Sequence, residues 1–281
     1  MTTGTCLCGA VRYEVDGPFS FMGHCHCSMC RKAHGSIFVT WAAAPLAGFR
    51  WIQGEDAIER YESSPAGHRC FCRHCGAATP VFAESSVVVP AGTLDGDPGI
   101  RPQLHMFAAS KAPGFEITDD LPQYPEWPPG FDVPGVPRPA PAAREGANGS
   151  SCLCGDMAWE VEGPPSMMFH CHCSRCRHAR GAAFATNAFY ALGQFRWIRG
   201  EGLAATYKVP EAQFFTQVFC RRCGGKGPRL LPEHDRVVLP VGPMEGPPGR
   251  AVDAHIYVGS KAPWDQITDL LPQFEERPTR R

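Results

Sequence analysis

The sequence has neither a long hydrophobic run nor an excess of charge of one sign. No stretch of its 281 residues approaches the roughly 18 consecutive apolar residues of a membrane-spanning helix, and the opening residues MTTGTCLCGA lack the basic and apolar regions of a secretory signal. Lys and Arg total 27 and Asp and Glu total 28, so the net charge of -1 favours neither nucleic acid nor an anionic membrane as a partner. These absences predict a cytoplasmic protein that binds neither.

Extended helical periods of apolar residues are also lacking. Val11, Tyr13 and Val15 instead alternate with Arg12 and Glu14, which is typical of a strand with one buried face. Similar short apolar runs in the first half lie at residues 37–43, 49–52, 86–92 and 104–107. Residues 30–36 and 176–182 are each compatible with a single helical turn. The sequence therefore predicts a small, mostly β fold that depends on metal to complete its core.

The chain contains the same pattern twice. Cys6 and Cys152 are 146 positions apart, while His105 and His255 are 150 apart, so the second half has small insertions relative to the first. Matched segments include HCHCSMCR with HCHCSRCR and ITDDLPQY with ITDLLPQF. Solenoid repeats have periods of about 20 to 50 residues, so a repeat of this length predicts two complete domains.

Between the two copies lies a segment rich in Pro, Gly and Ala that has no hydrophobic periodicity. Such segments form extended, semi-rigid linkers. We expect a first domain at residues 1–123, a linker at 124–149 and a second domain at 150–281. The sequence gives no expectation about how the two domains pack.

Cysteine is the most informative residue type, with 15 copies in close pairs and triplets. An odd number of closely grouped cysteines argues against disulfide bonds, which also do not persist in a reducing cytosol. In each copy a C-x-C pair and a C-x-x-C pair together give the usual four-thiolate set of a structural zinc site. The predicted sets are Cys6, Cys8, Cys72 and Cys75 in the first copy, and Cys152, Cys154, Cys220 and Cys223 in the second.

Each copy also contains a C-x-C-x-x-C triplet, formed by Cys25, Cys27 and Cys30 in the first copy and by Cys171, Cys173 and Cys176 in the second. Three thiolates can hold a zinc ion whose fourth position stays open, as in catalytic sites. The alternative is a closed structural site whose fourth ligand is His24 or His26, or in the second copy His170 or His172. A residue next to a ligand on an extended chain points away from it, which weakens this alternative.

The charge of a triplet site favours some ligands over others. Zinc with three thiolates carries a formal charge of about -1, which makes it a weak Lewis acid and a poor source of hydroxide, so hydrolysis is disfavoured. A thiolate substrate is a natural fourth ligand, since it completes an all-sulfur tetrahedron. Coordination raises the ionised fraction of a thiol of pKa about 8.5 by at most about 30-fold, so positioning of the thiol and its electrophile has to supply further rate enhancement.

The run GHCHCSMCRKAHGS, together with CLCGAVRYEV, FCRHCG and SKAPGFEITDDLPQY, resembles the glutathione-dependent formaldehyde-activating enzyme family, also called the GFA or CENP-V domain family. Each half is similar to one complete family domain. The resemblance implies two β-tent domains of packed β-sheets, each with a structural zinc on the four-cysteine set and an exchangeable catalytic zinc on the triplet. It also implies a carbon–sulfur lyase activity that joins glutathione, or a similar small thiol, to formaldehyde or a related aldehyde.

Addition of a thiolate to a carbonyl group needs an acid that protonates the developing alkoxide. His26 and His172, which lie between triplet cysteines, are the candidates for this acid. Each is equally compatible with a hydrogen-bonding role or with simple exposure. The copies also differ nearby, since His34 corresponds to Arg180, so one pocket is expected to differ in ligand preference or to be inactive.

Two other functions remain open from the sequence. A tandem zinc-binding module with structural zincs only would present a surface to a protein partner, and replacing the triplet cysteines would not affect it. A zinc-linked redox sensor would use the triplets and Cys70, the cysteine left over from seven per copy, whose counterpart is Val218. The oligomeric state is not predicted by the sequence.

Overall fold

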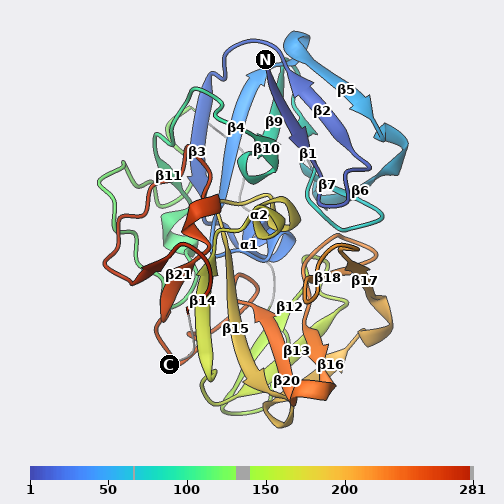
Figure 1. Cartoon of the computed structure of the whole chain (residues 1–281), viewed down its shortest axis with the longest axis vertical. Helices are drawn as coiled ribbons and strands as arrows, with labels where there is room; N and C mark the ends of the chain where they lie inside the picture. Colours follow the sequence, from blue (N-terminus) through green and yellow to red (C-terminus); the bar gives the residue numbers. More distant parts are fainter. Residues whose placement is uncertain (66, 131–139, 279–281) are drawn as a thin grey trace.

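Short strands and tight turns make up most of the chain in the computed structural model, which describes residues 1–65, 67–130 and 140–278 (Figure 1). Strands β1 to β11 belong to the first copy and span Thr2–Thr5, Arg12–Val15, Phe21–Cys25, Val39–Pro45, Phe49–Gln53, Ile58–Ser64, Gly67–Cys72, Val81–Phe82, Ser86–Pro90, Leu94–Asp95 and His105–Met106. Strands β12 to β22 belong to the second copy and span Ala147–Ser151, Ala158–Glu162, Met167–Cys171, Ala185–Ala191, Phe195–Arg199, Ala204–Lys208, Thr216–Cys220, Arg229–Leu231, Arg236–Pro240, Ala254–Ile256 and Gln273–Phe274. The prediction of a mostly β fold is confirmed.

The described strands of each copy form three sheets with matching connections. In the first copy the strand orders are β10-β1-β2-β5, β11-β3-β4-β9-β8 and β6-β7. The counterparts in the second copy are β12-β13-β16, β19-β20-β15-β14-β21-β22 and β17-β18. β3 pairs antiparallel with β4 and parallel with β11, just as β14 pairs with β15 and β21. The end of β3, and likewise the end of β14, is therefore held by a strand on each side.

A short helix follows each of the strands β3 and β14. Helix α1 spans Ser28–His34 and α2 spans Ser174–Arg180, so each is seven residues long and begins inside the triplet. The prediction of a single turn after the last cysteine is wrong in both start and length. The physical reason is the cap at the helix start, where the backbone N–H of Cys30 donates to the Sγ atom of Cys27 at 3.4 Å.

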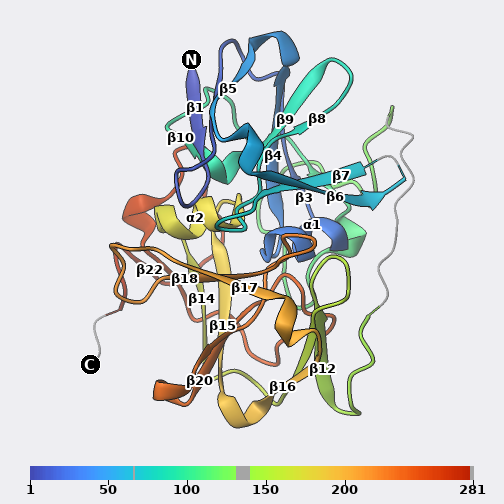
Figure 2. The same ribbon diagram turned by 90° about the vertical axis from the view of Figure 1, so that its right-hand side faces the viewer.

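The two copies pack against each other through these helices. Helices α1 and α2 lie at the centre of the molecule, between the blue strands of the first copy and the yellow and orange strands of the second (Figures 1 and 2). His34 Nδ1 lies 2.6 Å from the carbonyl oxygen of Arg180, so the C-terminal ends of the helices meet. A single hydrophobic core includes Val89 from the first copy and Trp159 and Leu239 from the second. The halves are therefore joined by a shared core.

The interface has approximate twofold symmetry, because some residues contact their own counterparts. The pairs that do so include Phe38 with Phe184, Phe71 with Phe219, and Thr118 with Thr268. The ring centroids of the first pair are 5.4 Å apart, and those of the second pair are 6.4 Å apart. A residue contacts its counterpart only near a twofold axis. The copies are thus arranged as in a symmetric dimer, although they belong to one chain.

The two turns that follow β7 and β18 meet at this interface. Gly76 and Gly224 have φ angles of 69° and 70°, and a Cβ atom on either would overlap the ring of Phe219 or Phe71, respectively. The side chain of Lys226 is buried between the turns and donates hydrogen bonds to the carbonyl oxygens of Gly76 and Gly224. Burial lowers the pKa of Lys226 to about 7. One amine therefore ties the two turns together.

The second copy begins slightly earlier than the domain boundary expected from the sequence. Strand β12 starts at Ala147, within the segment predicted as a linker, and residues 131–139 of that segment lie outside the described residues. The division into two domains and a linker stays a prediction. Neither α1 nor α2 has the length and apolar character needed to cross a membrane, and the described residues contain no other helix that does.

Candidate metal centres

The first four-cysteine set comes from two separate turns. Cys6 and Cys8 lie between β1 and β2, Cys72 ends β7, and Cys75 lies in the turn that follows. Their Sγ atoms all lie within 4.8 Å of one another. The sulfur–sulfur distance is 3.5 Å between Cys6 and Cys8 and 3.7 Å between Cys8 and Cys72. The fold therefore brings together all four cysteines that the sequence grouped.

The second four-cysteine set has the same construction. Cys152 and Cys154 lie between β12 and β13, Cys220 ends β18, and Cys223 lies in the following turn. Their Sγ atoms also lie within 4.8 Å of one another, with 3.4 Å between Cys152 and Cys154 and 3.8 Å between Cys154 and Cys220. The two copies thus give two independent examples of one geometry.

These sulfur positions fit a tetrahedral metal site. Two thiolates bound to one zinc ion at about 2.3 Å lie about 3.8 Å apart, whereas the sulfurs of a disulfide lie about 2.05 Å apart. All fifteen cysteines are free. The backbone N–H groups of Val11 and Met157 donate to Cys6 and Cys152 at 3.3 and 3.4 Å, respectively, and such bonds stabilise thiolates. Each four-cysteine set can therefore hold a metal ion with four sulfur ligands.

Each triplet lies where a strand meets a helix. Cys25 is the last residue of β3, Cys27 caps the start of α1 and Cys30 lies in its first turn, and the three Sγ atoms lie within 4.8 Å of one another. Cys171, Cys173 and Cys176 form the corresponding group in the second copy. The structure therefore brings together both predicted triplets. Among the described residues, no histidine or carboxylate completes either group of three.

The histidines next to the triplet cysteines form hydrogen bonds away from the sulfurs. His24 and His26 lie on the opposite side of the chain from the cysteines, and His24 Nδ1 lies 2.9 Å from the Thr40 hydroxyl oxygen. His26 Nε2 lies 2.9 Å from His105 Nδ1, and His105 Nε2 lies 2.9 Å from an oxygen of Asp119. This geometry does not support a histidine as the fourth ligand of the first triplet, in agreement with the alternation of an extended chain.

The second copy repeats the histidine chain with one addition. His172 Nε2 lies 2.8 Å from His255 Nδ1, and His255 Nε2 lies 3.0 Å from Asp269. Asp265 adds a carboxylate oxygen 3.4 Å from His172 Nδ1. Its counterpart in the first copy is Phe115, whose ring stacks on His26 at 6.0 Å. Sequence reasoning missed these partners, although the repeated ITD segment and the repeated histidine 150 positions apart were available as signals.

Burial determines the pKa of His26 in the histidine chain of the first copy. Burial and the nearby His105 and His24 rings lower the pKa of His26 to about 2. Both His26 and His172 are fully buried. The role of these two histidines as catalytic acids stays a prediction, and their contacts favour a different role, in which they hold the strand that carries the triplet.

Aromatic side chains pack on the triplet in both copies. Phe107 and Met106 pack on the first triplet, and the Phe107 ring lies 5.0 Å from that of Trp127. Tyr257 and Phe215 pack on the second. Phe107 and Tyr257 are counterparts with left-handed backbone conformations, at φ angles of 57° and 59°. Such a conformation is costly for a bulky residue and is retained where the surroundings impose it, often at functional sites.

The triplets also differ in exposure and in nearby charge. All three cysteines of the first triplet are buried, whereas Cys173 of the second is half-buried. The Nη2 atom of Arg69 lies 3.6 Å from the Sγ atom of Cys30. A guanidinium at this distance donates a charge-assisted hydrogen bond to a thiolate. Sequence reasoning missed Arg69, because 39 residues separate it from Cys30.

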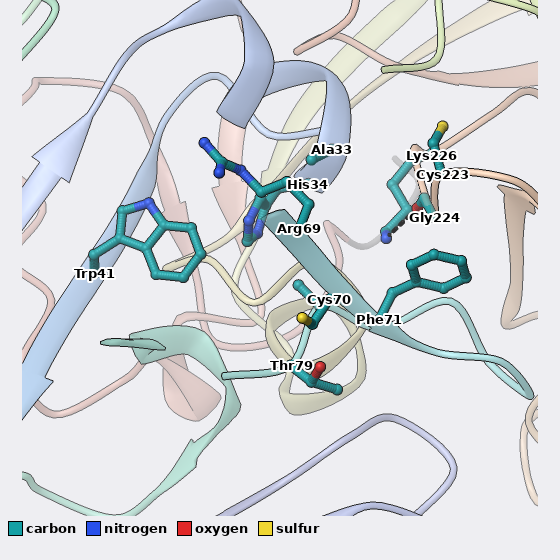
Figure 3. Close-up of a pocket in the computed structure, with 11 residues that line it drawn as sticks. Ala33, His34, Trp41, Arg69, Cys70, Phe71, Thr79, Cys223, Gly224 and Lys226 are labelled. Carbon is teal, nitrogen blue, oxygen red and sulfur yellow. Dashed lines mark hydrogen bonds between the residues drawn. The ribbon is translucent and has the colours of Figure 1, made fainter. Parts of the chain in front are cut away.

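A small cavity lies beside the first triplet, between the two copies. Its volume is about 10 Å³, enough for at most one water molecule. Figure 3 shows Lys226 and Gly224 of the second copy facing it, together with Cys70, Trp41 and Arg69 of the first. Burial raises the pKa of the Cys70 thiol, which makes it a poor nucleophile at neutral pH. The cavity is too small for a substrate.

A further group of possible ligands, His170, His255 and Asp269, has atoms within 4.8 Å of one another. Both ring nitrogens of His255 already have hydrogen-bond partners, namely His172 and Asp269. His170 Nδ1 lies 2.8 Å from the hydroxyl oxygen of Thr186. We therefore treat this group as part of the histidine chain and not as a metal site.

Short packed sheets with two copies of a seven-cysteine pattern define a tandem β protein with candidate metal sites in each copy. The family model of the glutathione-dependent formaldehyde-activating enzymes matches residues 1–110 and 147–260. The chain belongs to this family, once in each half, so the resemblance seen in the sequence is confirmed. The matched ranges contain both four-cysteine sets and both triplets, but end before Asp119 and Asp269.

Two known proteins illustrate the relationship. A Halomonas elongata protein, whose name assigns it to the glutathione-dependent formaldehyde-activating enzymes, is 30% identical over 129 residues, covering 44% of this chain and 69% of that protein. A Rhodobacter sphaeroides protein of known crystal structure has 31% sequence identity and a TM-score of 0.28, covering 34% of this chain and 89% of the other.

Proposed function

We propose that the chain is a zinc-dependent carbon–sulfur lyase-type enzyme that joins glutathione, or a similar small thiol, to formaldehyde or a related aldehyde. The observation that carries this proposal is the triplet, in which three sulfurs gather without a fourth ligand from the described residues. Catalytic zinc sites keep such an open position, whereas structural sites are closed. The family of the chain and the named activity of its Halomonas relative support the same reaction.

The proposal assigns a different role to each kind of cysteine group. The four-cysteine sets would hold structural zinc, because each is closed, all-sulfur and packed into the interface between the copies. The triplets formed by Cys25, Cys27 and Cys30 and by Cys171, Cys173 and Cys176 would hold catalytic zinc. Full occupancy then corresponds to about four zinc ions per chain. Each of residues 1–123 and 150–281 would form one domain.

The chemistry of the reaction is an addition without oxidation or reduction. Zinc bound at a triplet would offer its open position to a thiol and favour the thiolate form. The carbon–sulfur bond forms as the carbonyl π bond breaks, and the proton lost by the thiol ends on the carbonyl oxygen. Phe107 in the first copy and Tyr257 in the second would exclude water from the reacting atoms.

The remaining residues of the site would hold it in place. His26 and His172 anchor the chain between the triplet cysteines through His105 and His255. This anchoring fixes the three sulfurs before a substrate arrives, so less order has to be gained on binding. Cys173 is half-buried whereas the cysteines of the first triplet are buried, so the second triplet has the more accessible residue, which favours the second copy as the more active one.

The test is the formation of S-hydroxymethylglutathione from glutathione and formaldehyde, followed by NMR exchange spectroscopy against the uncatalysed reaction. We expect acceleration by the zinc-loaded protein and its loss when Cys27 and Cys173 are both replaced by Ala. The proposal fails if the protein gives no acceleration, or if the double variant keeps it. Acceleration of another thiol with formaldehyde, but not of glutathione, would retain the reaction class and change the substrate.

A further inference from the structure

The starting point is the cation beside the third cysteine of the first triplet. Arg69 lies on β7 opposite Tyr61 of β6, and its Nη2 atom is 3.6 Å from the Cys30 Sγ atom. An arginine guanidinium is not deprotonated in proteins, so the Arg69 side chain stays charged beside the triplet. Its position therefore sets a permanent positive charge against the triplet.

The second copy has no arginine at this register position. Gln217 occupies it, opposite Tyr207 in the corresponding β17-β18 hairpin. The Gln217 side chain is buried and neutral. If a charge at this point served only the local fold of the hairpin, the second copy would be expected to keep it, since the hairpin itself is conserved between the copies.

The second copy instead carries an arginine at another position near its third cysteine. Arg180 lies on α2 four residues after Cys176, which places the two side chains on the same face of the helix. Its Nη2 atom donates to the Asn187 side-chain oxygen at 3.4 Å. Arg229 comes from β19. Burial lowers the pKa of Arg180 to about 10, so this side chain stays charged at pH 7, and burial also lowers the pKa of Arg229.

The four positions involved have changed together between the copies. The first copy has His34, Trp41, Arg69 and Val81, and the second has Arg180, Asn187, Gln217 and Arg229 at the equivalent helix and strand positions. In the first copy burial lowers the pKa of His34 to about 4, so this side chain is neutral at pH 7. Each copy therefore has a guanidinium near the third cysteine, but supplies it from a different element.

We propose that a guanidinium beside the third cysteine is a working part of each triplet site, supplied by Arg69 in the first copy and by Arg180 in the second. Its task is to offset the negative charge of the three thiolates and of a fourth, incoming thiolate. The part that concerns the incoming thiolate rests on the proposed function. The part that concerns metal binding does not.

The physical reason is the cost of gathering negative charge in a buried place. Zinc with three thiolates has a net charge of about -1, and a fourth thiolate makes it about -2. Opposite charges a few ångströms apart attract each other much more strongly at the effective dielectric of a partly buried site than in water, so one cation changes the affinity substantially. Residues that hydrogen-bond to metal ligands typically alter metal affinity by about 10 to 100-fold. Arg69 and Arg180 are thus positioning residues that act through the ligands.

The experiment measures zinc affinity at one triplet at a time. A parent chain with Cys171, Cys173 and Cys176 changed to Ser reports on the first triplet alone, and zinc is titrated against a chromophoric chelator. Arg69→Gln reproduces the side chain of the second copy and should weaken zinc binding at the first triplet by about 10 to 100-fold. Arg69→Lys keeps the charge and should restore part of the loss. An affinity within about twofold of the parent for Arg69→Gln would overturn the inference.

Two controls separate the effect from a general loss of charge or of folding. Arg101→Gln removes an equal charge from an exposed ion pair with Asp97 and should leave the triplet affinity unchanged. Circular dichroism and retention of two zinc ions in the four-cysteine sets show that a variant is folded. If Arg101→Gln weakens zinc binding as much as Arg69→Gln does, the position of the lost positive charge does not matter and the inference fails.

The second copy provides a rescue test. In a chain with Cys25, Cys27 and Cys30 changed to Ser, Arg180→His with Arg229→Val installs the first-copy residues and should weaken zinc binding at the second triplet. Adding Gln217→Arg should then recover at least about tenfold. An arginine that only supports folding would not be expected to restore zinc affinity when it is placed at residue 217, the position equivalent to Arg69. If the variant is folded and its zinc affinity does not recover, the inference is overturned.

The same proteins separate this inference from the proposed function. Zinc affinity is measured without any thiol or aldehyde, so it is independent of catalysis. Weakened zinc binding in a protein that accelerates no thiol–aldehyde reaction would retain the role of the arginines and reject the function. An active enzyme in which Arg69→Gln changes neither zinc affinity nor glutathione affinity would retain the function and reject the arginines.

Discussion

The first and second triplets each place three equivalently spaced cysteines at a junction of strand and helix, but the side chains around the two triplets differ. Arg31 and Lys32 of α1 are buried against the second copy. Arg31 donates a hydrogen bond to the Gly242 carbonyl oxygen, and Lys32 forms an ion pair with Glu245 at 2.6 Å. In α2 the corresponding contact, between His178 and Asp95, is longer at 3.5 Å. The comparison shows that one backbone plan tolerates two different electrostatic settings.

The four-cysteine sets differ far less between the copies than the triplets do. Both are closed by sulfur and both lie on turns that pack against the other copy. This contrast separates what holds the fold together from what can vary. It also leads to four predictions, in which a change to one copy is compared with the matching change to the other.

The largest effect is expected from breaking one four-cysteine set. Cys72→Ser should unfold both copies together, because apparent binding energies of structural zinc are about 10 kcal/mol or more and exceed a large part of the stability of an ordinary domain. Cys220→Ser should do the same. The measurement is zinc content combined with thermal unfolding by circular dichroism. A variant that melts in two separate transitions would show that the copies fold independently, contrary to the shared core.

The second effect concerns activity at the triplets. Cys27→Ala and Cys173→Ala should each release about one zinc ion per chain and leave the fold intact, because two thiolates hold zinc poorly. Since Cys173 is the more exposed residue of the two, its removal should cost the larger share of S-hydroxymethylglutathione formation. Zinc analysis and initial rates check this. Equal losses from the two single variants would contradict the predicted inequality.

A smaller effect is expected at the two turns that meet at the interface. Gly76→Ala places a Cβ atom against Phe219 at a position with positive φ, and should destabilise the chain by about 2 to 4 kcal/mol. Gly224→Ala should cost a similar amount, because it meets Phe71 in the same way.

The matched control for these variants is Gly9→Ala. Gly9 has a φ of 75°, but no atom lies within 4 Å of the point where an alanine Cβ would sit, so only backbone strain of about 1 to 2 kcal/mol remains. Denaturant unfolding measures all three variants. If Gly9→Ala is as destabilising as the other two, the contact between the turns contributes nothing measurable.

The smallest effect is a pH dependence carried by Lys226. Burial lowers its pKa from 10.5 in the unfolded chain to about 7 in the fold. Between these pH values the unfolded chain binds more protons, so the free energy of unfolding rises with pH, by at most about 1.4 kcal/mol per pH unit. Lys226→Met removes this contribution. The first copy has Ala78 at this position and so lacks the effect.

The check is the difference in unfolding free energy between Lys226→Met and the parent chain, measured by denaturant unfolding from pH 7 to pH 10. The difference isolates Lys226 from the titration of the metal ligands, which are the same in both proteins. Lys208→Met, at an exposed position, serves as the control. Parallel pH profiles of unfolding free energy for Lys226→Met and the parent would show that the buried amine is not the source of the pH dependence.

The grouping of the cysteines could be predicted from the sequence alone to a large extent. Spacings such as C-x-C and C-x-x-C fix ligand separation through the local backbone, so the grouping of Cys25, Cys27 and Cys30 could be predicted before the fold was known. Alternation along an extended chain also predicted that His26 would point away from the sulfurs. The duplication was visible for the same reason, because the repeated groups are local.

Only the tertiary structure decided which distant residues meet these groups. The pairings of Arg69 with Cys30, His26 with His105 and Lys226 with Gly76 depend on strand register and on the twofold packing of the copies. Local spacing contains no information about such contacts, since they arise when hydrophobic surfaces from both halves are buried in one core. The sequence thus determined which cysteines are grouped, and the packing of the two copies determined the charged and aromatic side chains around them.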